Sequence, residues 1–222
     1  LMQFAMDKKV SDMTYLERKQ AYKWVNDHFT IINNNQIYSY SDIILFIEKV
    51  MRQQPVDAIF IDPYNSLRLD MGSKGISTHE YHYEAASELL TFSKSNDIAV
   101  WLNMHAVTEA QRRKGPDGLP VAPYAEDTEG GGKFVNRADC FMTIHRKVQS
   151  MDSDIRRMSE IHVRKVREVE TGGRPTPLED PYCLMMNLSH TGFTDRVGRR
   201  ALYQPISFSK EATMPMNMTF LC

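Results

Sequence analysis

The chain has 222 residues with a formal net charge of −1, and 42% of its residues are hydrophobic and 25% charged. This size suits one α/β domain with a sizeable core, and the near-neutral balance excludes a uniformly basic surface, so any nucleic-acid contact must come from local clusters. No apolar stretch approaches the roughly 20 residues that cross a bilayer, and no signal peptide opens the chain. Three widely spaced cysteines fit a reducing cytoplasm, and we expect no structural zinc.

The first half of the chain alternates between predicted strands and helices. Apolar runs predict strands at residues 1–6, 29–32, 57–61 and 98–104, with a turn at 33–35. Capping residues and helical spacing predict helices from Ser11 to about His28, after Ser41, and behind the capping box at 77–80. The expected buried faces comprise Met13, Leu16 and Trp24; Ile43, Ile44, Ile47, Val50 and Met51; and Tyr81, Ala85, Leu89 and Phe92. This alternation predicts a mostly parallel sheet covered by helices.

The character of the sequence changes after His105. Residues 108–132 are polar, rich in Gly and Pro and without periodicity, which predicts a functional or mobile connection. Shorter strands are expected at 141–144, 161–166 and 182–188, with a hairpin-like link at 170–173. We treat residues 1–202 as one partial domain and assign no role to the weakly patterned tail at 203–222.

Three of the predicted strands end in a polar residue, namely Asp7, Asp62 and His105. In an open α/β sheet the carboxyl ends of parallel strands share one edge, so these side chains are expected to converge on one crevice. Asp62 would hold Mg²⁺ through a water, Asp7 would orient or deprotonate a nucleophilic water, and His105 would sense a γ-phosphate. The alternatives are that Asp62 caps a turn and that His105 is a satisfied histidine at a strand end.

The second half of the chain contains candidate contacts to an anionic backbone. The segment 129–134 is only superficially like a Walker A motif, because Phe134 replaces the hydroxyl residue and the upstream spacing fails. We expect this glycine stretch to present backbone amides and a lysine to nucleic acid, helped by a basic run in the same excursion. The residues concerned are Gly131, Gly132, Lys133, Arg112, Arg113 and Lys114. The alternative is a solvated loop.

Two further cations, Lys165 and Arg167, project from the same face of an extended strand, and Arg146 ends another strand. Like charges on one face suggest a polyanion opposite them. A solvent face beside Glu168 or Glu170 is the alternative.

The order of these pieces resembles the RecA-like hexameric replicative helicases, that is, the DnaB group with its phage primase-helicase and Twinkle relatives. The resemblance covers roughly residues 1–195. Segment 4–7 resembles the strand with the catalytic carboxylate, segment 59–62 resembles the Walker B strand, and segment 101–105 resembles the strand that ends in a phosphate sensor. Segment 131–139 resembles the DNA-binding central loop and its helix, and segment 165–167 resembles the K-x-R motif. It implies a RecA-like three-layer α/β fold with a mostly parallel central sheet and additional C-terminal strands.

The resemblance also implies a function. It is ATP-dependent DNA unwinding and translocation on single-stranded DNA by a hexamer that uses ATP and Mg²⁺, with a primase or helicase loader as partner, in a bacterial or phage-infected cell. The implied catalytic residues are Asp7, Asp62, His105, Lys165 and Arg167, with Arg167 as the finger on a neighbouring subunit's nucleotide and Arg146 near the adenine.

Two departures from the family pattern matter. Asp7 stands where the family has Glu, and the P-loop that should precede Leu1 is absent from these residues. We therefore expect the C-terminal part of an ATPase domain that is inactive as this chain alone. The alternatives are a RecA- or KaiC-like ATPase in recombination or regulation, and a degenerate module that only binds DNA or a partner.

Overall fold

The computed structural model describes residues 1–32, 38–70, 75–128, 130–201 and 218–221, and the chain divides into two compact units. Among these residues, the first unit comprises 1–27, 111–124 and 140–201, and the second comprises 28–110, 125–139 and 218–221. Each unit is therefore assembled from three separate segments of the chain. The turn expected at 33–35 and most of the tail lie outside the described residues.

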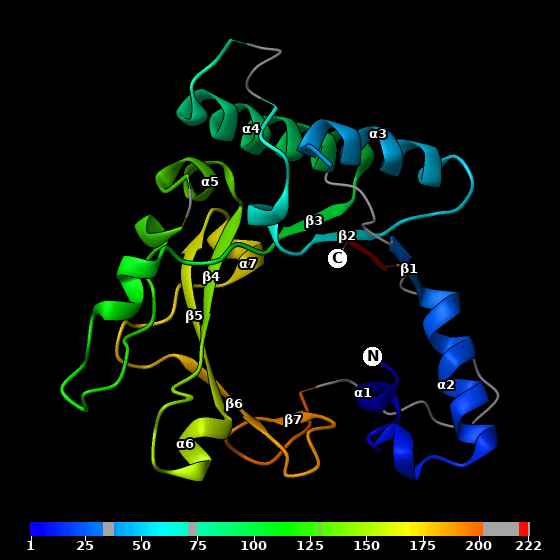
Figure 1. Cartoon of the computed structure of the whole chain (residues 1–222), viewed down its shortest axis with the longest axis vertical. Coiled ribbons are helices and arrows are strands. Elements are labelled where there is room, and N and C mark those ends of the chain that lie inside the picture. Colours follow the sequence, from blue (N-terminus) through cyan, green and yellow to red (C-terminus); the bar gives the residue numbers. More distant parts are fainter. Residues whose placement is uncertain (33–37, 71–74, 129, 202–217, 222) are drawn as a thin grey trace. The chain divides into compact units, whose positions relative to one another are not determined.

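The second unit is built on a parallel sheet. Its strands are β1 (Phe29–Ile32), β8 (Met218–Leu221), β2 (Ala58–Ile61) and β3 (Ala99–Leu102), in the order β1-β8-β2-β3. All three neighbouring pairs are parallel. The prediction of a parallel sheet is confirmed for this unit, in which β2 and β3 lie side by side (Figure 1). Strand β3 ends at Leu102, before the predicted end at residue 104.

The tail supplies a strand that the sequence did not predict. The backbone of β8 pairs residue by residue with β1 on one side and β2 on the other, so that Phe220 lies opposite both Ile31 and Phe60. Residues 218–221 are therefore an internal strand of this sheet.

Two helices, α3 (Tyr40–Met51) and α4 (Thr78–Asn96), begin at capping boxes. For α3 the cap is Ser39, whose side chain accepts from the Asp42 N–H, and not the predicted Ser41. Ser39 is the N-cap because Asp42 stands three residues later and its carboxylate accepts a hydrogen bond from the Ser39 N–H in return. The predicted box of Ser77 and Glu80 before α4 is confirmed.

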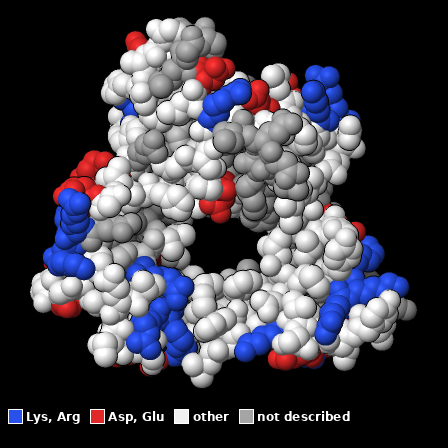
Figure 2. All heavy atoms as spheres, viewed as in Figure 1, with Lys and Arg blue, Asp and Glu red and all other residues white. Residues whose placement is uncertain are grey.

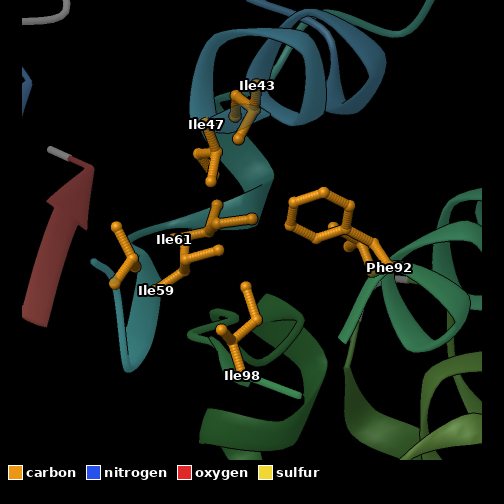
Figure 3. Packing of buried hydrophobic residues seen from close by; sticks show 8 residues of the cluster. Ile43, Ile47, Ile59, Ile61, Phe92 and Ile98 are labelled. Carbon is orange, nitrogen blue, oxygen red and sulfur yellow. The ribbon is translucent and has the colours of Figure 1, made fainter. Parts of the chain in front are cut away.

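Both helices pack on β2 through an apolar cluster. Ile43 and Ile47 of α3 point toward Ile59 and Ile61 of β2, and Phe92 of α4 lies on the same side (Figure 3). The predicted helix faces are confirmed, because Ile43, Ile47, Tyr81, Ala85, Leu89 and Phe92 are all buried. This packing fixes the position of β2, and Asp62 directly follows the end of that strand.

Short elements complete the second unit. They are the 3-10 turns η2 (Tyr64–Ser66) and η4 (Ala125–Asp127) and helix α5 (Gly132–Arg137), while η3 (Thr108–Arg112) spans the point where the chain passes to the first unit.

The first unit is built on an antiparallel sheet. Its strands are β4 (Cys140–His145), β5 (Met158–Val166), β6 (Tyr182–Met186) and β7 (Phe193–Thr194), in chain order. This sheet confirms the expected C-terminal strands. The link at 170–173 is largely a short helix, α7 (Val169–Gly172), and α6 (Ser153–Arg157) joins β4 to β5.

The strand predicted at residues 1–6 is wrong, because these residues form helix α1 (Met2–Met6). The run contains Leu, Met, Gln and Ala, which favour helix, and no β-branched residue. Phe4 stacks on Phe193 of β7, with ring centroids 6.0 Å apart, so the helix packs against the antiparallel sheet.

The following helix also differs from its prediction. After η1 (Val10–Asp12), helix α2 runs from Tyr15 to His28 and is capped by Thr14, which exchanges hydrogen bonds with Glu17. Met13 is buried as expected, but Leu16 is 68% exposed. No helix among the described residues is long and apolar enough to cross a membrane.

Candidate functional site

The strand ends of β2 and β3 place two polar side chains next to each other. Ile61 and Leu102 are partners in the parallel register, so Asp62 and Asn103 directly follow neighbouring strands. The side-chain amide of Asn103 donates a hydrogen bond to Oδ1 of Asp62, and its backbone N–H donates to the Ile61 carbonyl at 2.9 Å. Asp62 is therefore exposed but oriented.

The turn after Asp62 fixes His105 at the same edge. The Asp62–Pro63 peptide is cis, and the Tyr64 N–H donates to the Asn103 carbonyl at 2.8 Å. One residue further, Oδ1 of Asn65 accepts the His105 N–H at 2.8 Å. The backbone of His105 is therefore held by the turn that follows Asp62, at the carboxyl edge of the parallel sheet, although β3 ends three residues before His105.

Asn103 and Asn65 were not among the predicted site residues. Asn103 could have been found by the rule that selected Asp62, because it is the first residue after a strand of the same sheet. Asn65 could not, since its contact depends on how the turn closes.

The Asp62 carboxylate fits a cation that keeps its water. Among the described residues Asp62 has no ion pair, and its one hydrogen-bond donor is a neutral amide. No group of three or more His, Cys, Asp or Glu in the described part of the chain could hold a metal ion. A single exposed carboxylate suits Mg²⁺, which retains several waters, better than it suits a metal that needs a full protein cage.

The glycine segment packs on the turn that follows Asp62. Helix α5 begins after Gly131, carries Lys133 in its first turn and buries Phe134. The Phe134 ring meets the Tyr64 ring edge-on at 4.8 Å, and the Tyr64 hydroxyl hydrogen-bonds to Nδ1 of His82 at 2.8 Å in a buried position. The packing of Phe134 therefore holds helix α5, which carries Lys133, against the turn that follows Asp62, within one unit.

The predicted convergence of Asp7 is not found, because Asp7 does not end a strand. It follows α1 with a left-handed φ of 50° and belongs to the first unit. Its Oδ1 accepts from the Thr191 hydroxyl at 2.9 Å and Asn187 Nδ2 at 3.3 Å, and pairs with Arg200 at 3.1 Å. These contacts tie α1 to the loop between β6 and β7.

The basic run at 112–114 lies in a folded loop, which corrects the expectation of an unstructured connection. The Val121 N–H donates to the Arg113 carbonyl at 3.1 Å, and Lys114 and Pro120 form an antiparallel bridge. The Arg113 guanidinium lies 4.9 Å from the centre of the Tyr124 ring. Arg112 and Lys114 are exposed, so they are the members of the run that a ligand can reach.

The remaining predicted cations belong to the first unit. Lys165 is in β5 opposite Phe141, and Arg167 is exposed just after the strand ends at Val166. Arg146 follows β4 and donates to the Arg156 carbonyl at 2.8 Å. On the face shown in Figure 2, Lys and Arg form several separate groups with Asp and Glu beside them, which agrees with the near-neutral composition.

The chain is similar in sequence to one curated protein and in fold to two solved structures. It is 25% identical over 167 residues to the chloroplastic/mitochondrial Twinkle homologue of Arabidopsis thaliana, a match of 74% of this chain and 22% of that protein. A solved structure described as an ATPase domain matches with a TM-score of 0.68 and 14% identity, covering 88% of this chain and 68% of that one. No family model matches the chain.

A second solved structure leads to the same class of protein. A DnaB-like replicative helicase, described with its interactions with primase, matches with a TM-score of 0.65 and 15% identity, covering 87% of this chain and 46% of that one. The chain therefore has a mixed α/β fold that matches RecA-like helicase ATPase domains. In sequence the chain is distantly similar to the Twinkle homologue and spans 22% of that protein's length, and in fold it is similar to the ATPase domain and to the DnaB-like replicative helicase.

Proposed function

We propose that the chain is part of an ATP-driven motor that translocates on single-stranded DNA and unwinds duplex DNA as a hexameric ring. The observation that carries this proposal is the hydrogen bond between Asp62 and Asn103 at adjoining ends of β2 and β3, beside a turn in which Asn65 holds the backbone of His105. The distant relationship to DnaB-like and Twinkle helicases supports it.

In this proposal Asp62 holds the Mg²⁺ of bound ATP through a water, and His105 donates a hydrogen bond to the γ-phosphate. The metal, when bound, neutralises charge on the transferring phosphoryl group. Asn103 is a positioning residue, because it orients the Asp62 carboxylate. The base role predicted for Asp7 depends on the resemblance alone, since the strand expected to place it is a helix.

The cations of the first unit act between subunits in this proposal. Lys165 and Arg167 reach a neighbour's nucleotide, and Arg146 lies near its adenine. DNA is gripped through its backbone by residues 112–114 and by Gly131, Gly132 and Lys133, with little sequence preference.

The partner and the compartment follow from the same relationship. A primase or a helicase loader is the proposed partner, and one matched structure is described with primase. We place the protein in the cytoplasm of a bacterial or phage-infected cell. The Twinkle homologue of Arabidopsis thaliana is chloroplastic or mitochondrial, so an organelle is the alternative compartment.

We also propose that the isolated chain does not hydrolyse ATP appreciably, because its 222 residues contain no G-x-x-x-x-G-K-[ST] motif. Steady-state turnover by the purified chain would contradict the proposed inactivity.

The test joins the chain behind the P-loop segment of a DnaB-like helicase and measures DNA-stimulated ATP hydrolysis. Asp62→Asn should lower turnover by about a hundredfold or more, because the metal loses its charged anchor. Asp57→Asn is the matched control, since Asp57 is an exposed aspartate at the opposite end of β2 and its replacement should change little. Equal turnover in the two variants would remove Asp62 from the site.

A further inference from the structure

In the second unit, residues of α4 and Lys133 of α5 line an open hollow of about 320 Å³, and of its lining only Lys133 has a role in the proposed function. Its size lies at the lower end of the range for small-molecule pockets. The hollow is lined by Ile76, His79, Glu80, Tyr83, Glu84 and Lys133. Except for Ile76 and Lys133, these residues lie on adjoining turns of one face of α4.

One exposed aromatic ring, that of Tyr83, lines this hollow. Tyr83 is 46% exposed, and the guanidinium carbon of Arg137 lies 4.6 Å from the centre of its ring. Arg137 also donates a hydrogen bond to the Tyr83 hydroxyl. The ring is therefore held in one orientation before any ligand arrives, which lowers the entropy cost of stacking.

The charges around the ring favour a ligand that is neutral in one part and singly anionic in another. Lys133 and Arg137 are four residues apart on α5 and share one face of it. On the α4 side stand Glu80 and Glu84, and hydrogen bonds from Ser77 hold the pKa of Glu80 below its usual value. These carboxylates would repel a polyphosphate, which carries several negative charges, but they would not repel a neutral base.

We infer that this hollow binds one base of a single-stranded nucleic acid, stacked on Tyr83, while the adjacent phosphate pairs with Lys133. The inference rests on the proposed function and extends it, because it adds a base contact to a grip otherwise made through the backbone. Aromatic stacking accepts every base, since each has a π-face, so the site needs no sequence preference.

The test measures binding of the 222-residue chain to a fluorescent oligothymidylate by anisotropy. Tyr83→Ala should weaken binding by about 5- to 150-fold, and Tyr83→Phe, which keeps the ring, should bind nearly as wild type does. Tyr22→Ala is the matched control, because Tyr22 is 61% exposed on α2 in the other unit. Thermal unfolding of each variant verifies that it is folded.

A strand with abasic sites in place of the bases separates stacking from a structural effect. On this strand wild type and Tyr83→Ala should bind equally, because there is no base to stack. Lys133→Ala should weaken binding to both strands and reduce the slope of log K against log salt by about 0.7. A Tyr83→Ala deficit that persists on the abasic strand would overturn the inference.

The remaining outcomes separate this inference from the proposed function. Unchanged binding by Tyr83→Ala overturns the base site and leaves the backbone grip intact. No binding of either strand by the wild-type chain overturns the proposed DNA contact and the base site with it. A changed oligomeric state in Tyr83→Ala, without any difference between the two strands, would make the hollow an interface between copies and overturn the base site.

Discussion

At the scale of single residues, Asn103 at the end of one strand determines how the Asp62 carboxylate at the end of the neighbouring strand is oriented. Both directly follow strands of the same sheet, and the hydrogen bond between their side chains needs no movement of either backbone. An amide in this position orients a carboxylate without neutralising it, whereas a lysine or arginine would occupy it as an ion pair. The charge of Asp62 therefore stays available for a cation.

A pH-dependent contribution to stability is expected from Glu17 in the first turn of α2. Hydrogen bonds from the Thr14 backbone and from Lys8 lower the pKa of Glu17 from 4.5 to about 2. As the pH falls, the unfolded state takes up this proton first, so the contribution is complete above about pH 4.5 and is lost on the way to pH 2.

The variant Glu17→Gln should therefore be less stable than wild type at pH 7, and the difference should vanish toward pH 2. Urea unfolding at a series of pH values measures this. Asp27→Asn, which breaks an exposed ion pair with Lys23 at the other end of the helix, should cost only about 0.3–0.5 kcal/mol. A pH-independent deficit for Glu17→Gln would contradict the assignment.

Gly130 is expected to be irreplaceable because space and backbone conformation both require glycine there. Its φ is +78°, and an added Cβ would lie 2.9 Å from Phe134 Cε2 and 3.1 Å from His82 Cγ. Gly130→Ala should cost about 2–4 kcal/mol, the sum of left-handed strain and overpacking of a buried aromatic pair.

Gly75→Ala supplies the comparison for this prediction. Gly75 has a φ of +62° in the same unit, but an added Cβ there would meet nothing within 4 Å. Its replacement should cost only the strain of about 1–2 kcal/mol. Equal losses for the two variants in thermal unfolding would show that Phe134 and His82 yield to the added methyl group.

At the scale of elements, local signals predicted those parts that local physics determines. The Ser77–Glu80 capping box and the apolar faces of α3 and α4 were found correctly, because each depends on residues a few positions apart. The prediction of a strand at 1–6 was wrong because the structure of this segment is not determined by local signals alone. A short apolar run is ambiguous between strand and helix, and the contact of Phe4 with Phe193 lies far along the chain.

The residues of the candidate site also differ in whether local sequence patterns could reveal them. The place of Asp62 directly after a strand was predictable, since a polar residue that ends a buried strand is a local pattern, whereas His105 stands three residues beyond the end of β3. Asn65, Tyr64 and His82 were not predictable, because their roles arise from turn closure and from packing between η2, α4 and α5. The internal strand β8 was missed because four residues in a weakly patterned tail do not reveal their partners.

The sheet of the second unit should depend strongly on the side chains that α3 and α4 cover. Ile59→Ala, at a position that is 1% exposed, should cost about 2–5 kcal/mol because it leaves a cavity in the cluster of Figure 3. Ile31→Ala, in β1 and 57% exposed, should cost about 0.5 kcal/mol or less. Similar losses for both variants in urea unfolding would contradict this placement of the core.

At the scale of the whole molecule, the residues with proposed roles in catalysis and DNA binding are divided between two units. Asp62, His105 and Lys133 belong to the unit with the parallel sheet, and Lys165 and Arg167 belong to the unit with the antiparallel sheet. A ring of identical subunits offers a reason for this separation, since one subunit can supply the metal site and its neighbour the arginine.

This arrangement leads to an expectation for mixed rings of the chain extended with a P-loop segment. Arg167→Ala subunits are combined with wild-type subunits in increasing proportion, and DNA-stimulated ATP hydrolysis is measured. Pure Arg167→Ala rings should lose about 10³–10⁵-fold in rate, because an arginine finger stabilises transition-state charge.

In the mixed rings the activity should fall more steeply than in proportion to the fraction of mutant subunits. The reason is that, in a ring whose sites hydrolyse ATP one after another, one inactive site stops the sites that follow it. Arg174→Ala, which removes an exposed arginine beyond α7 in the same unit, is the control and should leave the activity unchanged at every ratio. Activity that falls only in proportion to the mutant fraction would mean that the sites work independently, and would contradict shared sites coupled around the ring.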